Sequence, residues 1–162
     1  MLDVNIRLTK LEDKEYLIKW LLDEDTLKWY PMSDRREVEH ASTIWMSYIN
    51  KEAVYTAEHN NEPCGCCLLY VSNIKKFAHQ ALFAIIVAKE HRGKGIGTAL
   101  IKKLIDVAKD EFKIEILHLE VYEGNPAISL YKRMGFERYG IHKKFIKDKD
   151  RYFDKIMMQR SL

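Results

Sequence analysis

The chain lacks any apolar run that approaches the roughly 20 residues of a membrane-spanning helix. Its first residues read as the beginning of a strand and lack the apolar core of a secretory signal peptide. We therefore expect a cytoplasmic protein with no membrane partner.

Cysteine is scarce and confined to one short stretch, at Cys64, Cys66 and Cys67. An odd, clustered set is a poor framework for disulfides and fits a reducing compartment. Successive side chains of a strand point to opposite faces, so this run is also a poor metal site. We expect buried thiols in a strand and no bound metal.

An excess of charge of one sign is also missing, because 27 Lys and Arg face 24 Asp and Glu, a net charge of +3. This balance is too small to indicate nucleic acid as a partner. Interleaved charges and a hydrophobic content of 47% argue against disorder. No repeat and no linker rich in Pro or Gly divides the chain, so residues 1–162 are expected to form a single domain.

Periodic apolar patterns predict a strand, two helices, three strands, a helix, a strand, a short helix and two strands. The predicted strands lie at 4–9, 53–59, 64–71, 81–88, 114–121, 136–142 and 151–158. The predicted helices lie at 11–23, 34–48, 99–108 and about 125–135. This order indicates an α/β or α+β fold, with a mixed sheet and helices on both of its faces.

A glycine-rich loop follows directly on the nearly continuous apolar strand 81–88. It reads Arg92-Gly93-Lys94-Gly95-Ile96-Gly97-Thr98, and a helical pattern comes after it. Free backbone N–H groups and the helix dipole favour an anion at such a position. The three glycines let a diphosphate approach the main chain, and two cations add charge. The loop therefore predicts a diphosphate site.

Other phosphate motifs do not match this spacing. A P-loop needs Lys-Ser or Lys-Thr after its last glycine, and neither is present. The dinucleotide fingerprint needs a third glycine one residue beyond Gly97 and alternating βα units, whereas this chain ends in a hairpin. The remaining structural alternative is a tight strand-to-helix turn, which rarely needs three glycines and two cations.

Two motifs resemble those of the GCN5-related N-acetyltransferase (GNAT) family. Arg92, Gly95 and Gly97 match the family loop R/Q-x-x-G-x-G/A. The stretch from Asn125 to Phe136 is similar to N-x-x-A-x-x-L-Y-x-x-x-G-F, with its alanine shifted by one residue. The order of elements also fits over nearly the whole chain. The resemblance implies an acetyl-CoA-dependent N-acetyltransferase with a mostly antiparallel sheet of about seven strands.

The resemblance also implies roles for backbone groups at the cofactor. The amides of the glycine loop would bind the pyrophosphate of acetyl-CoA. The strand end at Ile86, Val87 and Ala88 would splay from its neighbour, pair with pantetheine and polarise the thioester carbonyl. Asn125 would help to hold the cofactor or an ordered water, and it can also cap the helix that follows.

Tyr131 occupies the position of the family's usual general acid. A thiolate leaving group with a pKa near 8.5 needs a proton, which a phenol can supply. The alternative is that Tyr131 only packs its ring against the sheet. For the general base, strand 81–88 offers no carboxylate. His79, Glu120 and a relay of waters stay open as alternatives.

The acceptor is expected to be a primary amine of a small molecule. The acidic stretch 23–25 and the aromatic Trp29, Tyr30 and Trp45 could receive a cationic amine, or could form a solvated helix end and a core stripe. The region 143–155 could bind an acidic substrate or be solvated. Acetylation of a protein lysine or N-terminus, or a non-catalytic acyl-CoA sensor, are the alternative functions. A homodimer formed through strand edges or the final hairpin is also expected.

Overall fold

The computed structural model describes residues 2–162, which form one seven-stranded sheet in the order β1-β2-β3-β4-β5-β7-β6. Only β4 and β5 are parallel, and every other neighbouring pair is antiparallel. The mostly antiparallel sheet that the resemblance implied is confirmed. The strands are β1 (Asn5–Leu8), β2 (Val54–His59), β3 (Glu62–Tyr70), β4 (Gln80–Val87), β5 (Ile116–Tyr122), β6 (Glu137–Asp148) and β7 (Arg151–Ser161).

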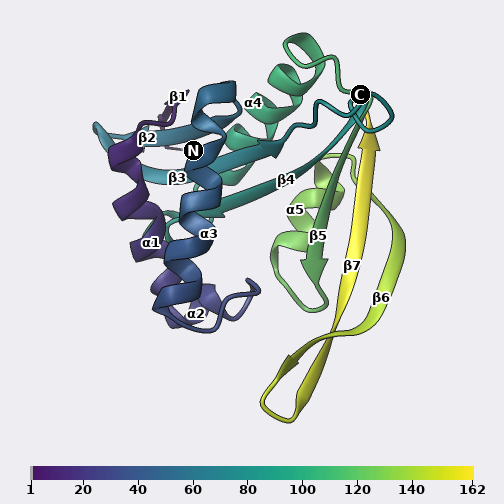
Figure 1. The fold of residues 1–162 in the computed structure, drawn as a ribbon. Coiled ribbons are helices and arrows are strands. Elements are labelled where there is room, and N and C mark those ends of the chain that lie inside the picture. Colours follow the sequence, from purple (N-terminus) through teal and green to yellow (C-terminus); the bar gives the residue numbers. More distant parts are fainter. Residues whose placement is uncertain (1) are drawn as a thin grey trace.

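Helices cover both faces of this sheet, as Figure 1 shows. The α-helices are α1 (Lys14–Leu22), α2 (Glu24–Leu27), α3 (Arg35–Ser47), α4 (Ile96–Asp110) and α5 (Ala127–Arg133). Short 3-10 helices lie at η1 (Leu11–Asp13), η2 (Ile49–Lys51) and η3 (Lys89–His91).

Two hydrophobic clusters lie on opposite faces of the sheet because strand side chains alternate. Leu68 and Ile86 join the cluster beneath α1 and α3, which contribute Leu17 and Trp45 among others. Phe83 of β4 joins the larger cluster on the other face, with α4 and α5. Within residues 2–162, the C-terminal strands have no helix on the α1–α3 face (Figure 1).

Helix α4 shows how the amphipathic pattern forms the core. Leu100, Ile101, Leu104 and Ala108 are fully buried and recur at helical spacing along one face. None of the helices described within residues 2–162 is long and apolar enough to cross a membrane.

The three cysteines lie in β3 and are buried and unpaired, as expected. A β-bulge interrupts the pairing of β2 and β3, since Ala57 pairs with Gly65 but Glu58 pairs with Pro63. The extra residue, Cys64, therefore faces the same cluster as Cys67. Burial raises the pKa of the Cys64 thiol to about 11, which keeps it protonated and unreactive.

The prediction and the structure differ in two places. The final hairpin is longer than the apolar pattern suggested, because β6 continues to Asp148 and β7 to Ser161. Most of the added residues of β6 are exposed, and backbone pairing with β7 joins them to the sheet. Helix α2 was not predicted, since four residues are too few for a periodic signal.

A buried carboxylate ties the first strand to the first helix. The Asp13 carboxylate accepts hydrogen bonds from Arg7 Nη1 at 2.7 Å and Arg7 Nη2 at 3.0 Å. Thr56 Oγ1 donates a third at 3.0 Å. Burial alone would raise the pKa of Asp13, but hydrogen bonds from Arg7 and from the Lys10 N–H outweigh it and lower the pKa. The ionised carboxylate therefore stabilises the fold.

We expect Asp13→Asn to lower the free energy of unfolding by about 1–3 kcal/mol at neutral pH, because a hydrogen-bonded charge is lost. The folded pKa of Asp13 is depressed, so its contribution is present above the unfolded pKa of about 3.9 and is lost as pH falls through the folded value. Urea unfolding at pH 7 and pH 3 measures both effects. The exposed Asp106→Asn is the control, with an expected change within about 0.5 kcal/mol. Equal losses in the two variants would contradict the role of Asp13.

Candidate functional site

Strands β4 and β5 separate part-way along their length. They pair in register only at Gln80–Ile116, Ala81–Leu117 and Leu82–His118. Beyond this point β4 stays with β3 as far as Val87, while β5 stays with β7 as far as Tyr122. The two strands diverge in Figure 1, which leaves the second half of β4 with an open edge.

Backbone groups of Ile85 and Val87 face this open edge. The carbonyl of Ile85 accepts the Tyr30 hydroxyl at 2.6 Å, and the carbonyl of Val87 accepts Arg92 Nε at 3.1 Å. In a strand the N–H and C=O of one residue point the same way, so the Ile85 and Val87 N–H groups face this edge too. The Ala88 N–H instead donates to Cys64 of β3 at 2.9 Å. An extended ligand can therefore pair with β4 as an added strand would.

The glycine loop joins the end of β4 to the N-terminus of α4. Gly93 and Gly95 have φ values of 72° and 87°, a left-handed conformation that favours glycine. Gly97 serves a different purpose, because a Cβ there would lie 3.0 Å from Leu130 Cδ2 of α5. The first turn of α4, from Ile96, presents N–H groups that have no partner within the helix. This geometry fits the predicted diphosphate site.

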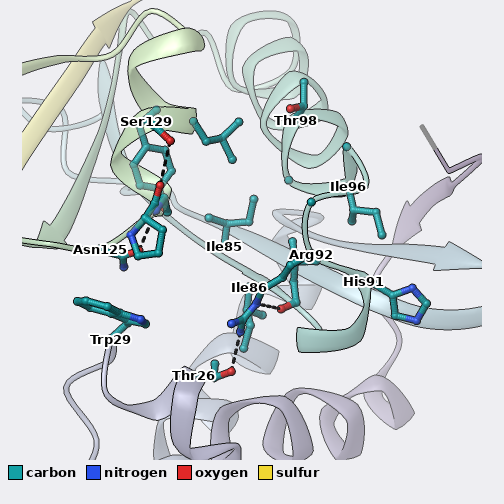
Figure 2. Close-up of a pocket in the computed structure, with 18 of the residues that line it drawn as sticks. Thr26, Trp29, Ile85, Ile86, His91, Arg92, Ile96, Thr98, Asn125 and Ser129 are labelled. Carbon is teal, nitrogen blue, oxygen red and sulfur yellow. Dashed lines mark hydrogen bonds between the residues drawn. The ribbon is translucent and has the colours of Figure 1, made fainter.

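A cavity of about 500 Å³, here called the loop cavity, lies between this loop, β4 and α5 (Figure 2). Most predicted binding residues line it: Ile86, Val87, Arg92, Gly93, Gly95, Ile96, Gly97, Thr98, Asn125 and Tyr131. Two predicted residues do not. Ala88 is buried behind the strand end, and Lys94 Nζ donates to the Glu90 carbonyl at 2.9 Å.

Arg92 connects the loop to helix α2. Its Nη2 donates to Thr26 Oγ1 at 2.6 Å, and its Nε donates to the Val87 carbonyl (Figure 2). The sequence interpretation missed Thr26, although Asp23 was a usable signal for a helix start. Asp23 Oδ1 accepts the Thr26 N–H at 3.2 Å and caps α2.

The acidic stretch 23–25 was one candidate for binding the amine. In the structure Asp25 forms an ion pair with Lys89, and Asp23 caps α2. Neither residue lines the loop cavity or the second cavity described below. The stretch therefore anchors α2 against the end of β4.

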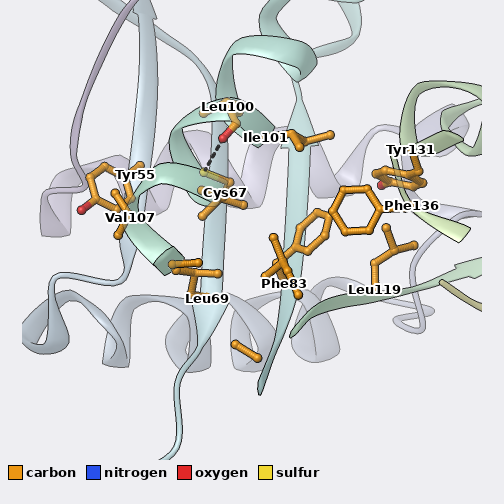
Figure 3. Close-up of a cluster of buried hydrophobic side chains, with 14 of the residues drawn as sticks. Tyr55, Cys67, Leu69, Phe83, Leu100, Ile101, Val107, Leu119, Tyr131 and Phe136 are labelled. Atoms are coloured by element: carbon orange, nitrogen blue, oxygen red, sulfur yellow. Dashed lines mark hydrogen bonds between the residues drawn. The ribbon is translucent and has the colours of Figure 1, made fainter. Parts of the chain in front are cut away.

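Tyr131 lies on α5 and is 8% exposed. Its ring meets Phe83 and Phe136 edge-on, with centroids 6.1 and 6.4 Å away (Figure 3). Burial raises the pKa of Tyr131 to about 12, so the phenol keeps its proton at neutral pH. The residue both packs in the core and lines the loop cavity, so the two predicted roles are compatible.

A second cavity of about 360 Å³, here called the aromatic cavity, lies on the other side of the split. Its aromatic lining residues are Trp29, Tyr30, Trp45, Tyr70, Phe83, Tyr122, Tyr131 and Phe145. Five residues line both cavities, namely Trp29, Tyr30, Ile85, Asn125 and Tyr131. The two cavities therefore meet where β4 and β5 part.

The structure separates the two candidate bases. Glu120 lines the aromatic cavity, and its Oε2 lies 3.1 Å from Lys155 Nζ. His79 precedes β4 at the end opposite the glycine loop and is exposed. Its carbonyl accepts the Glu115 N–H at 2.7 Å, and it lines neither cavity.

Asn125 contacts the start of α5 and borders the site. Its Oδ1 accepts the N–H of Ala127, the first residue of α5, at 2.9 Å. The same residue lines both cavities.

A family model described as the acetyltransferase (GNAT) family matches residues 14–136. The chain belongs to this family. The match includes the glycine loop and ends at Phe136, where the second motif ends. The matched residues thus include both motifs and the two strands, β4 and β5, that separate.

Three curated relatives are similar over part of the chain. An uncharacterized N-acetyltransferase of Methanocaldococcus jannaschii is 36% identical over 64% of this chain and 47% of its own length. The L-amino acid N-acetyltransferase of Escherichia coli is 32% identical over 51% of this chain and 52% of its own. The spermine/spermidine N(1)-acetyltransferase of Bacillus subtilis is 28% identical over 62% and 78%. The matched part thus spans about half the length of the first two relatives.

Solved structures match nearly the whole chain. A ribosomal-protein-alanine N-acetyltransferase from Brucella melitensis has a TM-score of 0.85 at 27% identity, over 98% of this GNAT chain and 99% of its own. An acetyltransferase from Salmonella typhimurium, solved with acetyl-CoA, has a TM-score of 0.82 over 98% and 93%. At 19% identity the second likeness shows the fold alone.

The open edge predicts an alternation in hydrogen exchange along β4. We expect the Ile85 and Val87 amides to exchange faster than the neighbouring Ala84 and Ile86 amides, which face β3. Amide exchange followed by NMR measures the four rates in one experiment. Uniform protection along β4 would contradict the assigned edge.

Proposed function

We propose that residues 1–162 form a single domain that transfers the acetyl group of acetyl-CoA to a primary amine by direct transfer in a ternary complex. The observation that carries this proposal is the meeting of two cavities at the β4–β5 split, with Tyr131 lining both. One cavity has the backbone groups that a long phosphorylated thioester requires, and the other can hold a small acceptor. Acetyl-CoA in the Salmonella typhimurium structure supports the choice of acyl substrate.

In this proposal acetyl-CoA occupies the loop cavity. The N–H groups at the start of α4 and the charge of Arg92 bind the pyrophosphate. The pantetheine amides pair with the edge groups of Ile85 and Val87. An N–H on that edge polarises the thioester carbonyl and stabilises the negative charge that develops on its oxygen.

The transfer step needs a proton donor and a proton acceptor. The amine nitrogen attacks the acetyl carbonyl carbon, so a C–N bond forms and the C–S bond breaks. The departing CoA sulfur takes the proton of Tyr131, whose raised pKa of about 12 keeps that proton available. The proton lost by the amine passes to Glu120, directly or through water. Glu120 is preferred over His79 because it lines the aromatic cavity.

The acceptor in this proposal is a small molecule. A volume of about 360 Å³ falls at the low end of the roughly 300–1,000 Å³ typical of small-ligand sites. The E. coli and B. subtilis relatives act on amino acids and on polyamines, as their names state. Acetylation of a protein N-terminus is the alternative that the Brucella melitensis structure favours.

We also infer a cytoplasmic location and a homodimer. Three buried, unpaired thiols fit a reducing compartment. Strand β6 is a sheet edge, and the exposed Tyr139 and Tyr152 on the final hairpin offer apolar surface for a second copy.

The first test is chromatographic detection of free CoA from acetyl-CoA with amino acids, polyamines and peptides as acceptors. Release with a small amine is expected, and release with peptides only would replace the small-molecule acceptor.

Gly95→Trp should abolish acetyl-CoA binding in calorimetry, because an indole enters the loop cavity at a left-handed position. Retained tight binding would overturn the assigned loop. Light scattering on the same samples reports whether the protein is dimeric.

The proton transfers predict distinct pH–rate profiles. Tyr131→Phe should lower kcat by about 10²-fold or more while acetyl-CoA affinity stays nearly unchanged, because only the hydroxyl is lost. Glu120→Gln should lower kcat and change the acidic limb of the profile.

His79→Ala serves as the comparison for Glu120→Gln. Its acidic limb should match that of the unmodified protein, since His79 lies outside both cavities. A shifted limb in His79→Ala with no change in Glu120→Gln would reverse the choice of base.

A further inference from the structure

The aromatic cavity contains a single pair of opposite charges. Among its lining residues in the described chain, Glu120 is the one acidic side chain and Lys155 the one basic side chain. The other polar groups are neutral, and most of the wall is aromatic or aliphatic. The cavity therefore has no net charge but has one fixed cation and one fixed anion.

Lys155 is an unusual residue in this position. Its side chain is 11% exposed, although lysine is almost never fully buried unless paired. Its Nζ lies 3.1 Å from Glu120 Oε2 and 3.8 Å from the centroid of the Phe145 ring. An ammonium has three N–H donors, and Glu120 accounts for one of them. The residue can therefore bind a further acceptor atom in the cavity.

Lys155 lies on a strand that is paired on both sides, with β5 and with β6. Lys155 is on β7, in register with Tyr122 of β5 and His142 of β6. Its partner Glu120 is on the same β5 strand, beyond the point where β4 diverges. The cation is thus built into the paired part of the sheet, at the wall of the aromatic cavity.

We propose, on the basis of the proposed function, that the acceptor is a small amino carboxylate with a large apolar side chain, and that Lys155 binds its carboxylate. Glu120 faces the amine, so each charge of a zwitterion meets an opposite charge. The neutral cavity matches a ligand of no net charge. The aromatic wall, with Trp45 and Phe145 among its residues, contacts the apolar side chain.

Other amines fit this arrangement less well. A polyamine brings at least two cations to a cavity whose one carboxylate already has a cationic partner. Its second ammonium would lie against an apolar wall or near Lys155, and both are unfavourable. A peptide N-terminus brings no carboxylate to the site, so Lys155 would gain no partner.

The test compares four amines as acceptors in the CoA-release assay. They are phenylalanine, phenylalanine amide, phenethylamine and spermidine. We expect kcat/KM for phenylalanine to exceed that for the amide and for phenethylamine by on the order of 10- to 100-fold, as expected for one hydrogen bond to a charged group. A preference for spermidine or for the amide would overturn the proposal.

Variants of Lys155 identify the residue responsible. Lys155→Met should raise KM for phenylalanine and remove the discrimination against phenethylamine, whereas Lys155→Arg should retain it. Lys143→Met is the matched control, because Lys143 pairs with Asp154 at the same 3.1 Å but is 75% exposed on the same hairpin. Discrimination that survives Lys155→Met in a folded protein, judged by circular dichroism, would also overturn the proposal.

A binding measurement separates this proposal from the proposed function. N-acetylphenylalanine carries the carboxylate and needs no turnover, so calorimetry tests Lys155 even if no amine releases CoA. Binding that is weakened in Lys155→Met and kept in Lys143→Met supports the carboxylate site. Equal binding in the two variants, or no binding to the unmodified protein, would contradict it.

Discussion

The break in pairing between β4 and β5 after Leu82 and His118 is the constraint on which the site depends. Each strand keeps its other neighbour, so neither half of the sheet loses its support. The break exposes the backbone of Ile85 and Val87 at the point where the loop and aromatic cavities meet. A continuous ladder would have used these groups for strand pairing and left no polar edge for a ligand.

Side chains on both faces of the sheet accompany the break. On one face, the rings of Phe83, Tyr131 and Phe136 pack together beside the split (Figure 3). On the other face, Tyr30 reaches across from the segment after α2 and donates to the Ile85 carbonyl. The buried phenol of Tyr131 is therefore part of the core and part of the site, and ring packing fixes its position.

Helix α2 links the two cavities physically. The Thr26 hydroxyl accepts a hydrogen bond from Arg92 of the glycine loop. Trp29 and Tyr30, which follow the helix, border the aromatic cavity. The loop has its cation beside a helix N-terminus, whereas the aromatic cavity has a balanced charge pair. In the proposed complex this difference in electrostatics suits an anion in the loop cavity and a zwitterion in the aromatic cavity.

Local patterns were enough for the sequence to determine most of the elements and much of the loop cavity. Apolar periodicity located all seven strands, and Gly93, Gly95 and Asn125 could be interpreted from turn and helix-start chemistry, which involves only neighbouring residues. Only the tertiary structure decided how far β4 and β5 pair, that Thr26 holds Arg92, and that Lys155 rather than the acidic stretch 23–25 reaches the aromatic cavity. The physical reason is that these contacts join residues far apart in the chain, whose approach depends on sheet register and helix packing and leaves no periodic signal.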